Sequence, residues 1–445
     1  MRFTLLYVVP RHLHVVSSLV LLLMGASLAH AAGAALTLSE AQRLAAERSR
    51  QLVAHDSAVL ASREMATAAG QLPDPTLKLG INDLPVDGPD RYSTTRDFMT
   101  MRQIGVMQEF TRGEKRQLRT ERFEREAERA LAEKSATLAM IQRDTALAWL
   151  DRYYAEAMAA VVSEQIKEAR LEIKAAESAY RAGRGSQADV FAARSAVTML
   201  EDRASEFGRR IRTARTALGR WVGVTAEAPL AGKPDTETIR LDPRALEARL
   251  AHHPQIALFA KQAEVAATEV RLAQANKKSD WSLEVMYSQR GSAFSNMVSV
   301  NVAIPLQWDQ KNRQDRELAA KLAMADQAEA QRDEALRAHI AEVRSMIQEW
   351  DNGRERRARY ERELVPLAGE RAQAVLAAYR GGKASLNDVL AARRNEIEAR
   401  MQALQLEAET ARLWAQINFL FPDDTVARHS SATTIPLTNS PRGNR

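Results

Sequence analysis

The residues of this chain that could coordinate a metal ion are a group of methionines and one histidine pair. Thioether sulfur suits Cu(I) and Ag(I). Four methionines lie in or beside predicted strands: Met99, Met101, Met107 and Met286. Methionine is also an ordinary packing residue of strands and loops, which is the interpretation we favour. His252 and His253 precede Pro254 without a further histidine or an acidic cluster at ligand spacing, so the sequence predicts no metal site.

Residue patterns that support catalysis are also missing from the sequence. The chain has no cysteine, which excludes a thiolate nucleophile, thiolate metal ligands and disulfides. It contains no Gly-x-Ser-x-Gly motif and no glycine-rich phosphate loop after a strand. Acidic residues of the predicted long helices alternate with basic ones, a pattern typical of solvated faces. The sequence therefore predicts neither an enzyme nor a cofactor.

Charge is spread evenly along the chain. The 445 residues include 63 basic and 57 acidic side chains, a net charge of +6. Because neither sign is concentrated in one stretch, a nucleic-acid partner is not predicted. The apolar content of 45% is enough for large cores, but the long charged helices favour an elongated bundle over one globule.

Two stretches of the chain are nearly the same. Residues 180–194 and 379–393 agree at nine of fifteen positions, 199 residues apart, which indicates an internal repeat. Each copy begins with the end of a predicted helix, continues through a glycine-bearing break and enters a second apolar-periodic run. Gly183 and Gly382 can adopt the left-handed backbone conformation, and Ser186 and Ser385 can cap the following helix. Each stretch therefore predicts the tip of a helical hairpin, at residues 182–186 and 381–385.

The two ends of the chain are predicted to lie outside the folded part. Arg2 and Arg11 precede the apolar run 15–26, and Ala29-His-Ala31 has the small-x-small form of a signal-peptidase site. Residues 1–31 therefore predict a secretory signal peptide, with a membrane anchor as the alternative, although the run is short for a span. The polar segment 421–445 lacks the apolar content to fold, so we expect it to be disordered.

Four short segments alternate apolar and polar residues with the period of a β-strand. They cover residues 76–83, 101–110, 280–289 and 297–306, two in each half of the chain. The residues expected on their apolar faces are Leu77, Leu79, Ile81, Ile104, Val106, Phe110, Trp281, Leu283, Val285, Tyr287, Val298, Val300, Val302 and Ile304.

Long helices surround the predicted strands. Residues 113–181 contain no proline and mostly helix-forming residues, which predicts a helix on the order of 100 Å long. The domain plan is a first repeat at 32–222, a linker at 223–241 and a second repeat at 242–420. Each repeat contains a helix, two strands and a long helical hairpin. In the second repeat we expect a kink at Pro366.

Amphipathic strands of this length, in an exported protein, match the size needed to cross a bilayer within a β-barrel. Four strands are too few to close a barrel, because lipid offers no partner for an open sheet edge. Several copies must then combine their strands, giving eight from two chains or twelve from three. The alternative is a small soluble sheet that ends a coiled coil, as in a soluble periplasmic adaptor.

The duplicated layout and the tip pattern Tyr-x-x-Gly-x-x-x-x-x-Asp-Val resemble the TolC-type outer-membrane efflux proteins, from about Thr37 to Leu420. The resemblance implies a mostly α fold with a minor β part. It implies a homotrimer, in which four strands per chain form a twelve-stranded transmembrane β-barrel and the hairpins form an α-barrel across the periplasm. The implied partners are outer-membrane lipid, a periplasmic membrane-fusion adaptor and an inner-membrane pump of the resistance-nodulation-division type. The implied location is the outer membrane of a Gram-negative bacterium.

Residues 72–77, 83–89 and 95–110 are similar to the branch of that family that exports heavy-metal cations, the CzcC-like and copper/silver-exporting proteins. The expected function is a passive exit duct of a tripartite efflux system, with heavy-metal cations as the leading cargo. A duct for drugs or for secreted proteins is the alternative within this class.

The resemblance also implies roles for residues at the tips. Asp388 matches an aspartate that rings the periplasmic entrance, although the position three residues on, acidic in some members, is Ala391 here. Asp388 could instead only cap its helix, as Asp189 could in the first repeat. Tyr379 matches a tyrosine that holds the inner hairpin shut, with Arg380 and Lys383 as possible partners. The expected adaptor-contact residues are Gly183, Arg184, Ser186, Asp189, Gly382 and Ser385.

Overall fold

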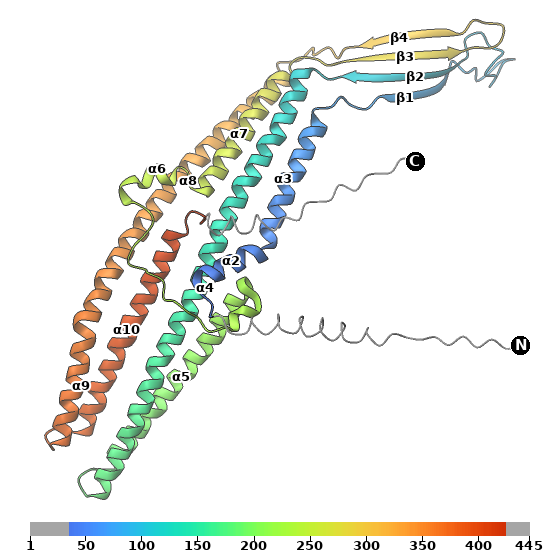
Figure 1. Cartoon of the computed structure of the whole chain (residues 1–445). Helices are drawn as coiled ribbons and strands as arrows, with labels where there is room; N and C mark the ends of the chain where they lie inside the picture. The colour runs from blue at the N-terminus through green and yellow to red at the C-terminus, as the bar shows by residue number, and fades with distance from the viewer. Residues whose placement is uncertain (1–34, 424–445) are drawn as a thin grey trace, which may run out of the picture. The chain divides into compact units, whose positions relative to one another are not determined.

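The computed structural model describes residues 35–423 and is mostly helical, with one four-stranded sheet (Figure 1). The predicted signal peptide and most of the predicted C-terminal tail lie outside the described residues. The chain divides into two compact units. We call residues 50–139 and 241–344 the sheet unit, and residues 35–49, 140–240 and 345–423 the tip unit. Helices α4 and α8 contribute residues to both units.

The sheet unit contains all four strands in the antiparallel order β1-β2-β3-β4. The strands are β1 (Thr76–Asn82), β2 (Met101–Phe110), β3 (Trp281–Gln289) and β4 (Met297–Ala303). Its helices are α3 (Arg50–Ala69), α6 (Leu246–Leu250), α7 (Pro254–Ala275) and the first parts of α4 (Gly113–Arg181) and α8 (Gln314–Arg359). The strands pair in chain order, so β2 and β3 join the two halves of the duplicated sequence.

Three strands are shorter than the alternation predicts, β3 only by its first residue, since it begins at Trp281. β4 ends at Ala303, so Ile304 lies outside the strand that it was expected to join. Pro305 follows directly and has no amide hydrogen to donate to a ladder, which ends regular pairing. β1 ends at Asn82 because Asp83 has a φ of 52°, a left-handed conformation that turns the chain out of the strand.

The tip unit is built from two antiparallel hairpins (Figure 1). In the first, α4 leads to α5 (Gln187–Val222), and a 3-10 helix (Gly223–Glu227) follows. In the second, α8 and α9 (Val365–Arg380) lead to α10 (Leu386–Asn418). Of the helices found within residues 35–423, none is both long enough and apolar enough to cross a membrane.

The helix expected before the strands of the first repeat is two helices in the structure. α2 covers Leu38–Arg48 and α3 begins at Arg50, because Ser49 has an extended conformation. The N-cap is Thr37, whose hydroxyl accepts a hydrogen bond from the Glu40 amide. Ser39 lies inside the first turn.

The predicted kink near Pro366 takes the form of a π-helical turn. Residues Tyr360–Leu364 form this wider turn, and α9 begins immediately after it, with proline within its first two positions. Since proline cannot donate to the preceding helical turn, local widening is a regular way of accommodating it.

Two tryptophans at equivalent places of the long helices bind extended segments that precede the strands of each repeat. Trp149 and Trp350, both buried, lie at matching places 201 residues apart. The Trp149 indole donates to the carbonyl of Leu36 at 3.1 Å, and the Trp350 indole donates to the carbonyl of Thr236 at 3.2 Å. Each repeat therefore fixes an extended segment to its long helix through a buried indole, which satisfies a polar group in the core of the tip unit.

Candidate functional site

The two hairpin tips have the same backbone geometry. In the first, the amide of Arg184 donates to the carbonyl of Ala179 at 2.9 Å; in the second, Lys383 donates to Ala378 at 2.8 Å. Gly183 and Gly382 have φ values of 70° and 71°, which a side chain would strain. The two copies of the repeated sequence thus fold into the same turn.

Each tip is followed by a complete capping box. The Asp388 carboxylate accepts from the Ser385 amide at 2.9 Å and from the Ser385 hydroxyl at 2.7 Å, and the Asp388 amide donates back to that hydroxyl at 3.2 Å. Ser186 and Asp189 make the same three bonds in the first tip. The hydroxyl and amide of Ser385 hold the pKa of Asp388 below its usual value. Asp388 is therefore an exposed carboxylate that caps α10, and capping leaves its proposed role at an entrance open.

Replacing Ser385 with Ala is expected to cost about 1 kcal/mol at the start of α10, because the first amides of the helix lose their acceptor. The predicted signature is faster hydrogen–deuterium exchange at residues 386–390. Ser186→Ala is the matched variant and should loosen only α5. The stabilisation that the Asp388 carboxylate gives the cap is fully present above the pKa that this group has in the unfolded chain. It is lost as the pH falls through the lowered pKa in the folded chain. Unchanged exchange at residues 386–390 would contradict the cap.

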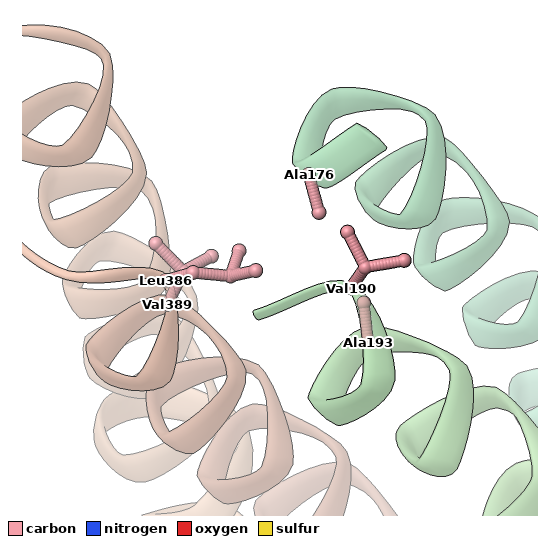
Figure 2. Close-up of a cluster of buried hydrophobic side chains, with 5 residues drawn as sticks. All are labelled: Ala176, Val190, Ala193, Leu386 and Val389. Carbon is pink, nitrogen blue, oxygen red and sulfur yellow. The ribbon is translucent and has the colours of Figure 1, made fainter. Parts of the chain in front are cut away.

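The two tips pack on each other through a small apolar cluster, shown in Figure 2. Leu386 and Val389 of α10 face the side chains of the first hairpin, and both are almost fully buried. The first hairpin contributes Ala176, Val190 and Ala193. Because these contacts join segments about 200 residues apart, the cluster holds the two hairpins of one chain together at their ends.

Equivalent residues of the two tips have different surroundings. Tyr379 and Leu390 pack against the apolar cluster. Their counterparts in the first tip, Tyr180 and Phe191, are 49% and 56% exposed. Among the described residues, the Tyr379 hydroxyl makes no hydrogen bond, so the latch expected for this tyrosine stays a prediction about an assembled form.

A cluster of largely buried charged side chains links α4 to α10, a few helical turns from the tips. The Arg393 guanidinium lies 2.9 Å from Glu396, 3.3 Å from Glu168 and 3.6 Å from Glu172. Glu396 is 3% exposed and also pairs with Arg400 at 2.8 Å. Three carboxylates thus share two guanidinium groups. Glu168, Glu172 and Arg393 also line a groove of about 660 Å³ between α5 and α10, which gives solvent a route to the cluster.

The sequence interpretation missed this cluster, because it assigned the acidic and basic residues of the long helices to solvated faces. Arg393, Glu396 and Arg400 follow the i, i+3, i+7 spacing of one helix face, and Glu168 and Glu172 follow an i, i+4 spacing. That spacing is also typical of exposed ion pairs. Only the packing of α4 against α10 separates the buried case from the exposed one.

Burial raises the pKa of Glu172; Arg393 acts against this, and the neighbouring Glu168 carboxylate adds to it. A raised folded pKa means that the stability contributed by Glu172 is present below its unfolded pKa. That contribution is lost as pH rises through the folded pKa. The contribution of Glu172 by itself is therefore greatest at acidic pH, and Arg393 reduces the cost of ionising this carboxyl group.

The sheet has one apolar and one polar face, set by its register. Ile104 of β2 pairs with Tyr287 of β3, and Val285 of β3 pairs with Val300 of β4, so these side chains share a face. The expected apolar residues of the four strands all lie on it, apart from Ile304, which is beyond β4. This face is open: Leu79, Val298 and Val300 are 71%, 68% and 64% exposed. Contiguous exposed apolar surface of this kind marks an interaction site.

The opposite face of the sheet is mostly polar, and most of its residues on the central strands β2 and β3 are half-buried or buried. Lys78 of β1 pairs with Glu284 of β3 at 3.1 Å, reaching across β2. Gly105 of β2 lies beside this ion pair, and a Cβ there would meet the Val285 carbonyl oxygen at 2.9 Å. Both outer strands, β1 and β4, have one edge without a strand partner among the described residues. Such edges are templates for pairing with another chain.

The methionines and the histidine pair lie on different elements. Met99 is in the loop after β1, while Met107 and Met286 lie on the polar face of the sheet. His253 caps α7 by accepting from the Gln255 amide, and its ring lies 4.2 Å from that of His339. Within the part of the chain that the structure describes, no three histidine, aspartate or glutamate side chains are grouped to hold a metal ion.

An exposed apolar sheet face joined to two long helical hairpins is the TolC-like channel fold. Solved outer-membrane proteins have it. The outer-membrane channel OprN matches with a TM-score of 0.73 at 17% identity, over 87% of this chain and 90% of that one. VceC from Vibrio cholerae matches at 0.71 and 21% identity, over 86% and 95%. CusC, described as forming a transmembrane channel, matches at 0.74 and 14% identity, over 87% and 92%.

Comparison of the sequence with family models and with curated proteins finds no match. The likeness to solved channels therefore lies in the fold. The predicted mostly α fold, with a minor β part and duplicated hairpins, is confirmed, and the structure shows that the strands are antiparallel.

Proposed function

We propose that this chain is the outer-membrane exit duct of a tripartite efflux system. It conducts substrate passively from an inner-membrane pump and a periplasmic adaptor to the exterior, and its leading cargo is heavy-metal cations. The observation that carries the proposal is the sheet: its apolar face is exposed, and each of its two outer strands has an edge without a strand partner among the described residues. A soluble protein would bury the apolar face.

The proposed assembly is a homotrimer. Because lipid cannot satisfy open strand edges, β1 of one chain must pair with β4 of the next. Three copies of the four-stranded sheet give twelve strands, a number within the range of membrane barrels. The polar face, with Lys78 and Glu284, would then line the interior, and the hairpins of the three chains would form a helical tunnel in the periplasm.

Conduction through such a duct requires no catalytic group, and we propose that the chain is not an enzyme. The energy for transport would come from the pump. Asp388 would lie at the periplasmic aperture with Tyr379, Arg380 and Lys383, and the turns around Gly183 and Gly382 would contact the adaptor. Ser186, Asp189 and Ser385 support these turns through the capping boxes.

Replacing Asp388 with Ala is expected to raise single-channel conductance or weaken block by multivalent cations, because three carboxylates around an aperture attract cations. Planar-bilayer recordings of the purified trimer measure both. Asp189→Ala is the matched control, since it removes the same cap from the other tip. If the two variants behave alike and match the unmodified channel, Asp388 only caps its helix.

Deletion of the gene tests the cargo. Cells that lack the duct should become sensitive to particular metal cations, and minimum inhibitory concentrations for a panel of metals and drugs measure this. If the cells become sensitive to drugs but to no metal, the cargo is drugs and not metal cations. A defect in secretion of a polypeptide would point to the protein-export alternative.

A soluble periplasmic adaptor is the competing function from another class. It predicts extraction of the mature chain without detergent and no heat-modifiable oligomer on a gel. The open apolar face of the sheet argues against it, since water would contact Val298, Val300 and Leu79 directly.

A further inference from the structure

Exposed basic side chains mark both tips at equivalent positions. Arg181 and Arg184 lie at the first tip, and Arg380 and Lys383 lie at the second, all of them exposed. Arg181 and Arg380 end their helices, where a cation is favourable to the helix dipole. Arg184 and Lys383 lie beyond the helices, in the turns, so the dipole does not explain them.

The carboxylates at the tips are already engaged. Asp189 and Asp388 each accept two bonds from their capping serine. Within residues 35–423, neither Arg184 nor Lys383 makes an ion pair or a side-chain hydrogen bond. With two basic residues and one acidic residue, each tip keeps a charge of +1. The basic groups therefore remain available to a partner.

The positions of the two basic residues are fixed by the backbone. Arg184 and Lys383 are held by the same amide bond to the preceding helix, 2.9 Å and 2.8 Å long, and each follows a glycine with positive φ. The neighbouring pairs Ala182/Gly381 and Gly185/Ala384 differ in residue type, but the basic charge is retained in both copies. The turn thus places the backbone of a basic residue at the same position in both copies, and complementary charge of this kind guides the choice of a binding partner.

We propose that the two tips form a basic docking surface for a protein partner that presents carboxylates. This rests on the proposed function and names the chemistry of the partner that meets the tips. The exposed aromatic residues Tyr180 and Phe191 lie close to Arg184 in sequence, and aromatic and arginine side chains are the usual anchors of protein interfaces. The carboxylates of the partner would pair with Arg184 and Lys383.

A protein fits the tips better than an anionic lipid surface does. Membrane attraction usually needs four to eight basic residues together in one segment, accompanied by exposed apolar side chains. Here each tip has two basic residues, and the apolar residues of the second tip, Leu386 and Val389, are 3% and 0% exposed. The second tip therefore offers charge without an apolar anchor.

The test uses the full mature chain in phosphatidylcholine nanodiscs, with poly-L-glutamate as the carboxylate probe. At low salt the unmodified protein should bind it, and Arg184→Glu with Lys383→Glu should weaken binding about tenfold. The control reverses two exposed basic residues of the sheet unit, Lys311→Glu and Arg316→Glu. With the same change in net charge, it should stay within about twofold of the unmodified protein.

Equal loss in both double variants would overturn the proposal, because net charge alone would then explain binding. So would unchanged binding after reversal at the tips. Phosphatidylglycerol vesicles form the second arm, and binding of these vesicles without binding of poly-L-glutamate would assign the tips to lipid. Planar-bilayer conductance distinguishes failure of the proposed exit duct from failure of the proposed docking surface. If the unmodified protein does not conduct, the proposed duct is wrong. If it conducts but reversal of charge at the tips leaves binding of poly-L-glutamate unaltered, only the proposed docking surface is wrong.

Discussion

Replacing Val300 with Arg is expected to abolish assembly in the outer membrane. Val300 lies in β4 on the apolar face of the sheet and is 64% exposed. An arginine on the lipid face of a membrane strand costs about 2–4 kcal/mol at mid-depth, and in the proposed trimer every chain bears this cost. The heat-modifiable oligomer should disappear from outer-membrane fractions analysed by gel electrophoresis.

The neighbouring residue supplies the control for this result. Asn301 is also exposed in one chain, but it lies on the polar face and pairs with Glu284 of β3. Asn301→Arg would place a guanidinium beside that carboxylate, so assembly should persist. If both arginine variants assemble equally well, the apolar face does not contact lipid. The proposed membrane sheet would then be wrong.

Replacing Arg393 with Ala is expected to destabilise the contact between the two hairpins of the tip unit by less than the about 3–5 kcal/mol that breaking a fully buried ion pair costs, because the Glu168 side chain is 38% exposed. Glu168 and Glu172 would lose their shared guanidinium, while Glu396 would keep only Arg400. Hydrogen–deuterium exchange at the start of α10 and protease cleavage at the tips should both become faster.

The defect in Arg393→Ala should depend on pH. Without the guanidinium, the pKa of Glu172 rises further, so protonation restores part of the lost stability as pH falls. Arg394→Ala is the control: Arg394 is exposed and makes no ion pair among the described residues, so its loss should cost less than about 0.5 kcal/mol. Equal protection from exchange in the two variants, at neutral and at acidic pH alike, would show that the cluster does not hold the hairpins together.

The sequence is enough to predict which residue matters in the first of these two experiments but not in the second. Alternation alone separates Val300 from Asn301, because successive side chains of any strand point to opposite faces. Arg393 and Arg394 are also neighbours, but no local pattern tells which one meets three carboxylates. Glu172 lies about 220 residues earlier in the chain, and only the packing of α4 against α10 brings it to Arg393.

Local signals likewise determined the turns. The two copies of the tip sequence predict positive-φ glycines and serine caps, because turn and cap geometry depend on a few adjacent residues. The structure contains both. It also ends β4 before Ile304, where the apolar alternation continues but Pro305 cannot join a ladder.

The sequence by itself determined the helical and extended segments, the duplicated plan and the side chains that share a sheet face, since each depends on residues close together in the chain. Only the tertiary structure decided the strand order, the burial of the Arg393 cluster and the different surroundings of Tyr180 and Tyr379. Two nearly identical tips differ in exposure because the apolar cluster covers one face of the second hairpin and leaves the matching face of the first open. Burial is a property of neighbours in space, so the tip pattern that the two copies share does not tell which copy is covered.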